Sequence, residues 1–139
     1  MNNLTENELV TYVSRMSVNE TTGRLEELLQ SKGMTIFSRI DHAEAARQVG
    51  MDLRPTILLV FGNPKAGTLI MQCAQSAAID LPLKFLIWEN EAGETLISYT
   101  DPETIASRHN IRGCTEILTK IGESIQSFAE SVTTVVDKN

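Results

Sequence analysis

The sequence predicts an α+β fold, with an antiparallel or mixed sheet of about five strands, helices packed on it and a long C-terminal helix. The order of the elements is the first reason, because three strand–helix pairs are followed by a β-hairpin and two helices. Such a mixed order argues against a parallel doubly wound sheet. The composition is the second reason, since 139 residues with 42% hydrophobic and 22% charged side chains suit one globular domain. We expect a single domain over residues 1–139, with residues 1–8 frayed.

Strands are predicted where β-branched and apolar residues alternate or run together. Residues 55–61 (PTILLVF) are apolar throughout, so we expect this strand in the middle of the sheet with both faces covered. A hairpin turn at residues 90–93 joins the last two strands. The predicted strands are residues 9–14, 34–40, 55–61, 83–88 and 95–99.

Helix starts are indicated by capping residues. Each cap is followed either by glutamate at the third helical position or by proline at the first. The predicted N-caps are Ser17, Asp41, Asn63 and Asp101.

The last helix, residues 113–136, is amphipathic. Its apolar stripe repeats at three- and four-residue steps through Leu118, Ile121, Ile125, Phe128, Val132 and Val135. Exposed on a monomer, this stripe would make a larger apolar patch than soluble proteins tolerate. We therefore expect a homodimer with residues 128–136 in the contact. Packing of the stripe on the domain's own sheet is the open alternative.

Charge and cysteine content exclude several classes of function. The net charge is −6 and no polybasic run occurs, so neither nucleic acid nor an acidic membrane surface is an expected partner. No apolar run approaches 18 residues, and the start MNNLTENELV lacks the features of a signal peptide. We expect a soluble, cytoplasmic protein. Two cysteines, Cys73 and Cys114, are too few for a disulfide framework. They could pair, but reduced thiols are the simpler expectation, with Cys73 buried and unreactive.

Several short motifs are spread over about half the chain. They are Phe37, Asp41-His42-Ala43, Ala46-Arg47, Gly50, Arg54-Pro55-Thr56, Phe61-Gly62-Asn63-Pro64, Asp80-Leu81-Pro82-Leu83 and Tyr99-Thr100-Asp101-Pro102. Together these motifs resemble domain-of-unknown-function family 302. The resemblance implies a small α+β fold similar to that of the TATA-box-binding protein, often dimeric. It implies no activity and supplies no catalytic residues.

Acid–base chemistry is one hypothesis for a site. Histidine side chains in general can exchange protons near neutral pH, so His42 could act with Asp41 or Asp101. Capping is the favoured role for Asp41, and adjacent side chains at a helix start seldom face each other. No metal site is expected, because the histidines and cysteines lack ligand spacing.

Anion binding is a second hypothesis. Residues 62–68 follow an apolar strand and open a helix, as phosphate-binding loops do, but the lysine of such loops is missing. The amides of Ala66 and Gly67, with Lys65, could still hold a small anion, against plain capping by Asn63. Arg54 could bind a carboxylate or phosphate, or form an ion pair with a surface aspartate.

The favoured interpretation is a homodimeric module that binds a small, anionic ligand without a cofactor. The alternatives are an enzyme built on His42 and a protein-interaction domain that acts through its last helix. The candidate site residues are Asp41, His42, Arg54, Asn63, Lys65 and Asp101.

Overall fold

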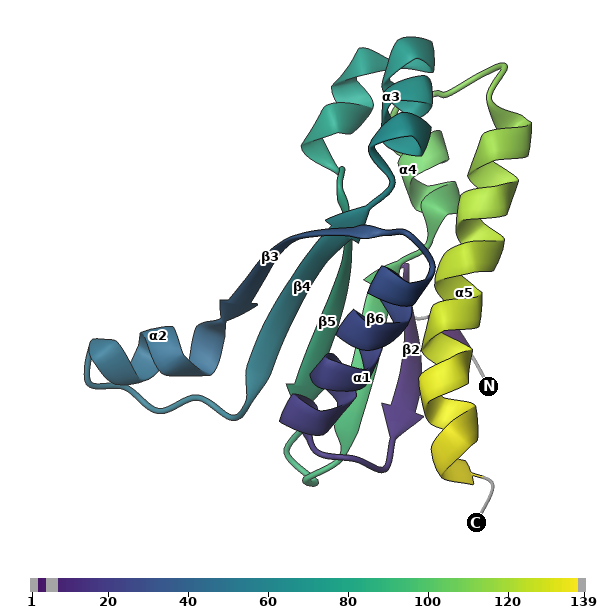
Figure 1. The fold of residues 1–139 in the computed structure, drawn as a ribbon. Helices are drawn as coiled ribbons and strands as arrows, with labels where there is room; N and C mark the ends of the chain where they lie inside the picture. The colour runs from purple at the N-terminus through teal and green to yellow at the C-terminus, as the bar shows by residue number, and fades with distance from the viewer. Residues whose placement is uncertain (1–2, 5–7, 138–139) are drawn as a thin grey trace.

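A computed structural model describes residues 3–4 and 8–137, and its centre is one antiparallel sheet (Figure 1). The strand order across the sheet is β1-β2-β6-β5-β4-β3, and every neighbouring pair is antiparallel. The α+β prediction is thus confirmed, with five longer strands and a two-residue β1. The strands are β1 (Asn3–Leu4), β2 (Leu9–Ser14), β3 (Thr35–Asp41), β4 (Thr56–Gly62), β5 (Leu83–Glu89) and β6 (Thr95–Thr100).

Helices cover one face of this sheet and one end of it. In Figure 1, α1 and α5 lie in front of the strands, α3 and α4 cap the upper end, and α2 reaches out beside β3. Within the described residues, no helix combines the length and apolar character needed to cross a membrane. The helices are α1 (Val18–Ser31), α2 (His42–Gln48), α3 (Pro64–Cys73), the 3-10 helix η1 (Gln75–Ile79), α4 (Pro102–Arg108) and α5 (Thr115–Asp137).

The predicted N-caps begin the helices for the expected reason. The side-chain oxygens of Ser17, Asp41, Asn63 and Asp101 accept hydrogen bonds of 2.9–3.1 Å from backbone N–H groups in the first turn. At Ser17 the reciprocal bond from its backbone N–H to Glu20 is also present, which completes a capping box. These short-range bonds satisfy donors that a helix otherwise leaves unpaired.

Side chains that alternate along the strands make the core under α1 and α5. Phe61 and Phe85 are fully buried and stack with their ring centroids 4.9 Å apart. Leu25 and Leu29 of α1 pack onto this cluster, and both are fully buried. Two strands and one helix thus meet at a single apolar centre.

The expectation that β4 has both faces covered is wrong. Leu59 is fully buried toward the helices, whereas Leu58 and Val60 on the opposite face are only half-buried. The strand lies second from the sheet edge, between β3 and β5. A continuous apolar run indicated more burial here than a two-layer architecture supplies.

As far as its side chains are described, the apolar stripe of α5 belongs to the chain's own core, which corrects the prediction that a partner covers Phe128 and Val132. Phe128 is 7% exposed and Val132 5%, and both join the cluster under α1. The side chains of residues 134–136 lie outside the described part. The helix is as long as expected, but it runs beside α1 in the same helical layer (Figure 1).

Two elements were not expected. Residues 1–8 were expected to fray, but Asn3–Leu4 pairs with β2. Residues 1–2 and 5–7 lie outside the described part of the chain. The 3-10 helix η1 follows α3 in a segment without clear periodicity.

The hairpin turn predicted at residues 90–93 is confirmed. Gly93 has φ 84° there, and its N–H donates to the Asn90 carbonyl.

Replacing Ser17 with alanine should lower the free energy of unfolding by about 1 kcal/mol, because the capping box of α1 is lost. The measurement is urea denaturation followed by circular dichroism. Ser127→Ala on the exposed side of α5 is the matched control and should leave stability nearly unchanged. Equal midpoints for the two variants would contradict a stabilising cap.

Candidate functional site

The six predicted site residues fall at two ends of the sheet. Asp41, His42 and Arg54 lie where β3 ends and β4 begins, and all three are exposed. Asn63 and Lys65 follow the other end of β4. Strand β4 spans six residue steps of about 3.4 Å, so its two ends lie roughly 20 Å apart, with Arg54 before one end and Asn63 after the other. The predicted anion site combining Arg54 with Asn63 and Lys65 is therefore wrong.

The acid–base pairing of His42 with Asp101 is also wrong. His42 follows β3 and Asp101 follows β6, and two strands separate these in the sheet. Three strand spacings of about 4.8 Å alone put at least 14 Å between them. Asp41 caps α2 through its bond from Glu44, and Asp101 caps α4. Capping, the favoured role of Asp41, is the one that its hydrogen bond supports.

The helix start at α3 does not offer free amides to an anion. Asn63 Oδ1 accepts the N–H groups of Lys65 at 2.9 Å and Ala66 at 3.3 Å. The N–H of Gly67 donates to the Asn63 carbonyl at 2.9 Å. Because proline at position 64 has no N–H, every amide of this first turn is accounted for, and the predicted cradle is wrong. Arg54 is likewise engaged, since its Nε donates to the Glu89 carbonyl at 3.2 Å.

A pocket of about 250 Å³ lies beside this helix start, between α3, α5 and the adjoining strand ends. Asn63 is the one predicted site residue that lines it. Most of its wall is apolar. The lining residues are Met34, Phe61, Gly62, Asn63, Pro64, Ala66, Gly67, Leu81, Pro82, Leu83, Ile117, Lys120, Ile121, Ser124, Ile125 and Phe128.

Few polar groups face the pocket. Of the described residues that line it, Lys120 is the charged one, and its side chain is exposed. Ser124 lies one turn further along the same helix and supplies a hydroxyl. An apolar cavity with one ammonium and a few hydrogen-bonding groups suits a small molecule with an apolar body and a polar end.

Sequence reasoning missed the α5 side of this pocket, although the signal was present. Ile117, Ile121, Ser124 and Phe128 recur at four-, three- and four-residue steps, which puts them on one side of the helix. Two of these residues, Ile121 and Phe128, belong to the stripe that was interpreted as a core or dimer face. Only the position of α3 opposite shows that part of this side borders a cavity.

A second hollow of about 280 Å³ lies on another side of α5. Asp101 lines it together with Glu103 and Glu123, so its charged groups are carboxylates. Among the described residues, no three histidine, cysteine, aspartate or glutamate side chains group closely enough to hold a metal ion.

The family model described as "Domain of unknown function DUF302" matches residues 10–132. The chain belongs to this family. The match includes the sheet apart from β1, all the helices up to α5, and both walls of the pocket. The resemblance expected from the sequence motifs is thereby confirmed.

The fold of this DUF302 domain is shared with a solved relative. The crystal structure of an uncharacterized conserved DUF302 protein from Bacillus stearothermophilus matches with a TM-score of 0.81. The match covers 90% of this chain and 98% of the other at 22% identity. At that identity the comparison establishes the fold alone.

Curated relatives of this DUF302 domain are longer proteins. "Fluoride-specific ion channel FluC 1" of Brucella suis is 40% identical over 111 residues, which are 80% of this chain and 44% of that protein. "Fluoride-specific ion channel FluC 1" of Brucella abortus is 40% identical over the same length, 41% of that protein. The chain therefore spans less than half the length of these relatives.

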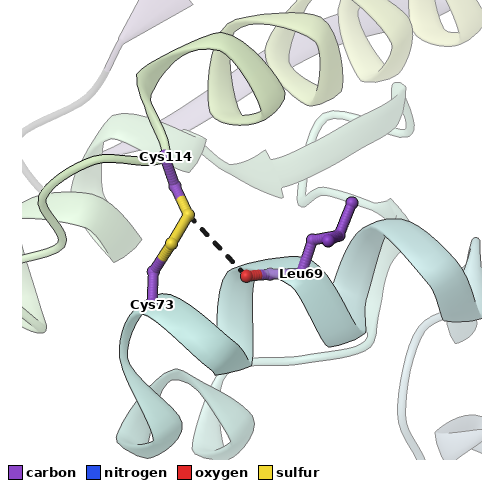
Figure 2. The surroundings of a disulfide bond; sticks show 3 residues. All are labelled: Leu69, Cys73 and Cys114. Carbon is purple, nitrogen blue, oxygen red and sulfur yellow. Dashed lines mark hydrogen bonds between the residues drawn. A yellow bond between two sulfur atoms is a disulfide. The ribbon is translucent and has the colours of Figure 1, made fainter.

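A disulfide joins the two helical walls of the pocket in this DUF302 domain. Cys73 ends α3 and Cys114 directly precedes α5, and their Cα atoms are 6.5 Å apart (Figure 2). The expectation of reduced thiols with Cys73 buried is therefore wrong. Cys73 is exposed because α3 ends there, beyond its contact with the core, while Cys114 is 9% exposed.

A hydrogen-bonded row connects η1 to α4 near the same end of the fold. His109 Nε2 donates to Asp80 at 2.6 Å, and Ser76 bonds to the other ring nitrogen at 2.8 Å. Arg108 also donates to Asp80, at 2.7 Å. The residue types are those of a hydrolase triad, but Arg108 neutralises the carboxylate and none of the four residues lines either hollow. We interpret the row as a structural connection.

The ionisation of Asp80 reflects these partners. Partial burial acts to raise the pKa of Asp80, but the bond from His109 and the charge and bond of Arg108 outweigh it, so the pKa lies below its usual value. A carboxyl group with a lowered folded-state pKa stabilises the protein above its unfolded-state pKa. That stability is lost as the pH falls below about 3.8, the ordinary value, toward the folded-state pKa.

Replacing Asp80 with asparagine should therefore destabilise the protein by about 1 kcal/mol at pH 7, through weakened bonds to Arg108 and His109. The difference from the natural protein should shrink as the pH falls below about 3.8, the ordinary value, because the unfolded chain then takes up a proton at Asp80 and the stabilisation by the ionised pair is lost. Urea denaturation at pH 7 and at pH 3 measures both, with Asp52→Asn in an exposed loop as the control. A difference that is the same at both pH values would argue against the ionised pair.

Proposed function

We propose that this DUF302 domain binds a small amphipathic anion, such as a medium-chain carboxylate, in the pocket between α3 and α5, and that it acts as a homodimer. The observation that carries the proposal is the 250 Å³ apolar cavity with Lys120 as its charged lining residue. This retains the predicted small-ligand module and moves its site from Arg54 and Lys65 to the inner side of α5.

The shape and chemistry of the pocket favour this ligand class. Its apolar wall, which includes Phe61, Ile121 and Ile125, gains free energy when a hydrocarbon body replaces water. A charged end group cannot lie against that wall unpaired. The Lys120 ammonium and the Ser124 hydroxyl supply a counter-charge and a hydrogen bond, so a carboxylate at this end and a chain in the pocket satisfy both requirements.

The competing interpretations have less support. An enzyme built on His42 lacks a convergent partner, since Asp101 lies at the other end of the sheet. An interaction domain that acts through α5 lacks the exposed stripe it was inferred from, because Phe128 and Val132 are buried. The Brucella relatives are named fluoride-specific ion channels, and that name describes proteins more than twice as long as the matched segment. We assign the shared segment a ligand-binding role.

The dimer surface is proposed at the arm formed by β3, α2 and the loop before β4. Five large apolar side chains are exposed there, and β3 is the last strand of the sheet, so its outer edge can pair with the same edge of a second copy. In Figure 1 this arm reaches away from the layer of α1 and α5. The exposed side chains are Phe37 (50%), Ile40 (38%), Val49 (72%), Met51 (65%) and Leu53 (48%).

Octanoate should raise the melting temperature of the protein, whereas inorganic phosphate and fluoride at equal concentration should not, because neither has an apolar body. Lys120→Met should weaken octanoate binding about fivefold, the equivalent of about 1 kcal/mol for a partly exposed ion pair. Ala66→Phe should abolish binding by filling the pocket. Thermal shift and isothermal titration calorimetry provide the measurements.

The matched controls for this experiment are Lys65→Met, which removes a nearby charge outside the pocket, and Leu69→Phe, which adds a ring on the outer side of α3. Both should bind octanoate as the natural protein does. Failure of octanoate to bind, or normal binding to Ala66→Phe, would refute the site.

Sedimentation at micromolar concentration should give twice the chain mass of 15.4 kDa. Val49→Asp combined with Met51→Asp should give a monomer with unchanged circular dichroism, because both changes put charge into the proposed apolar contact. Ile79→Asp on η1, where the side chain is 81% exposed, is the control and should stay dimeric. A natural protein that sediments as a monomer would remove the dimer from the proposal.

A further inference from the structure

The Cys73–Cys114 disulfide holds together the two walls of the proposed pocket. One wall is the first turn of α3, with Pro64, Ala66 and Gly67, and the other is a side of α5. The bridge links the last residue of α3 to the residue before α5, as Figure 2 shows. A covalent bond at this place limits how far the two helices can separate.

Apart from the bridge, α3 is held mainly by one side chain, Ile70, which packs against Ala77 and Ile105. Of its ten residues, all within the described chain, Ile70 alone is buried. Leu69 is 41% exposed, and Lys65 is exposed as well. A helix with one buried side chain has little apolar area to keep it docked. The bridge is therefore a second tie on α3, placed at the end of the helix opposite to the turn that lines the pocket.

The two sulfur atoms differ in their surroundings. Cys73 is exposed, so a thiol in solution can reach it, whereas Cys114 is 9% exposed. The Cys114 carbonyl accepts the N–H of Leu118 at 3.1 Å, which places this residue at the N-terminus of the 23-residue helix α5. Cys73 is therefore the sulfur that an external thiol can reach.

We propose that this disulfide is a thiol-exchange switch that regulates ligand binding in the pocket. In the oxidised state α3 is held against α5 and the pocket is formed. In the reduced state the α3 wall is released and affinity for the ligand falls. This regulation rests on the proposed function, because it acts on the same pocket.

The exchange step needs a dithiol as reductant. One thiolate of the dithiol attacks Cys73 Sγ, the electron pair of the sulfur–sulfur bond leaves with Cys114 as a thiolate, and a mixed disulfide forms. The second thiolate of the dithiol then attacks the dithiol's own sulfur in that mixed disulfide, and Cys73 leaves as a thiolate. Two electrons pass to the protein, both cysteines take up a proton, and the dithiol becomes a disulfide.

The reduced form leaves the buried thiol with an acceptor in place. Cys114 Sγ lies 3.7 Å from the carbonyl oxygen of Leu69, the contact drawn in Figure 2. After reduction the S–H group of Cys114 can donate a hydrogen bond to this oxygen, so the buried thiol keeps a partner. A disulfide with an exposed sulfur can be reduced and re-formed by thiol exchange, whereas a buried structural disulfide resists reduction.

The test compares the oxidised protein, the same protein reduced with dithiothreitol, and the double variant Cys73→Ser with Cys114→Ser. Hydrogen exchange of residues 64–73, read by mass spectrometry, should speed up at least tenfold on reduction, while β5 stays protected. Octanoate affinity should fall at least tenfold in the reduced protein. The double variant should behave like the reduced form with or without dithiothreitol.

The two readouts separate the switch from the proposed function. If oxidised protein does not bind octanoate, the proposed ligand fails, and faster exchange confined to α3 on reduction still supports the redox release of that helix. Unchanged exchange in α3 on reduction would overturn the switch even if octanoate binds. So would two free thiols after treatment with oxidised glutathione, since no bridge would then have formed.

Discussion

Phe61 and Phe85 stack at the centre of the sheet, and α1 and α5 close over them. Each large apolar side chain buried there contributes about 1.5–3 kcal/mol relative to exposure. Leu25 of α1 and Ile125 of α5 reach this centre from residues that are 100 positions apart in the chain. The remaining elements, including the pocket, take their positions from this contact between two helices and one face of the sheet.

The long helix α5 serves two surfaces at once. Ala129 and Val132 point into the core, while Ile117 and Lys120 line the cavity beside α3. Ile125 and Phe128 belong to both sets. Because core packing determines where α5 lies, the pocket wall on this helix is held in place by the core. The opposite wall is formed by α3, which has a single buried residue and a disulfide at its last residue.

Covering only one face of the sheet has consequences at the other face. Leu58 and Leu86 remain half-buried there, and the last strand β3 is exposed along almost its whole length. A two-layer domain of this kind leaves apolar surface that a second copy can bury. Helix α2 extends that surface beyond the sheet, because Ala43 is the one buried residue among the seven of this helix.

Local chemistry in the sequence determined where the elements begin and end. Ser17 and Asp101 cap helices through bonds to residues two or three positions away, and such short-range interactions depend little on the rest of the chain. Strand β2 occupies the predicted residues 9–14 for the same reason, because its alternation is a local property. Family membership likewise followed from short motifs.

Tertiary structure decided which residues meet. Cys73 and Cys114 are 41 positions apart, and nothing in their spacing indicated a bridge. Arg54 and Asn63 are close in sequence yet lie at opposite ends of β4, because an extended strand carries neighbours apart. The stripe on α5 showed that one side of the helix is apolar. Whether the chain's own sheet, a cavity or a second copy covers that side depends on strand order and helix placement, which arise from long-range packing and leave no periodic trace in the sequence.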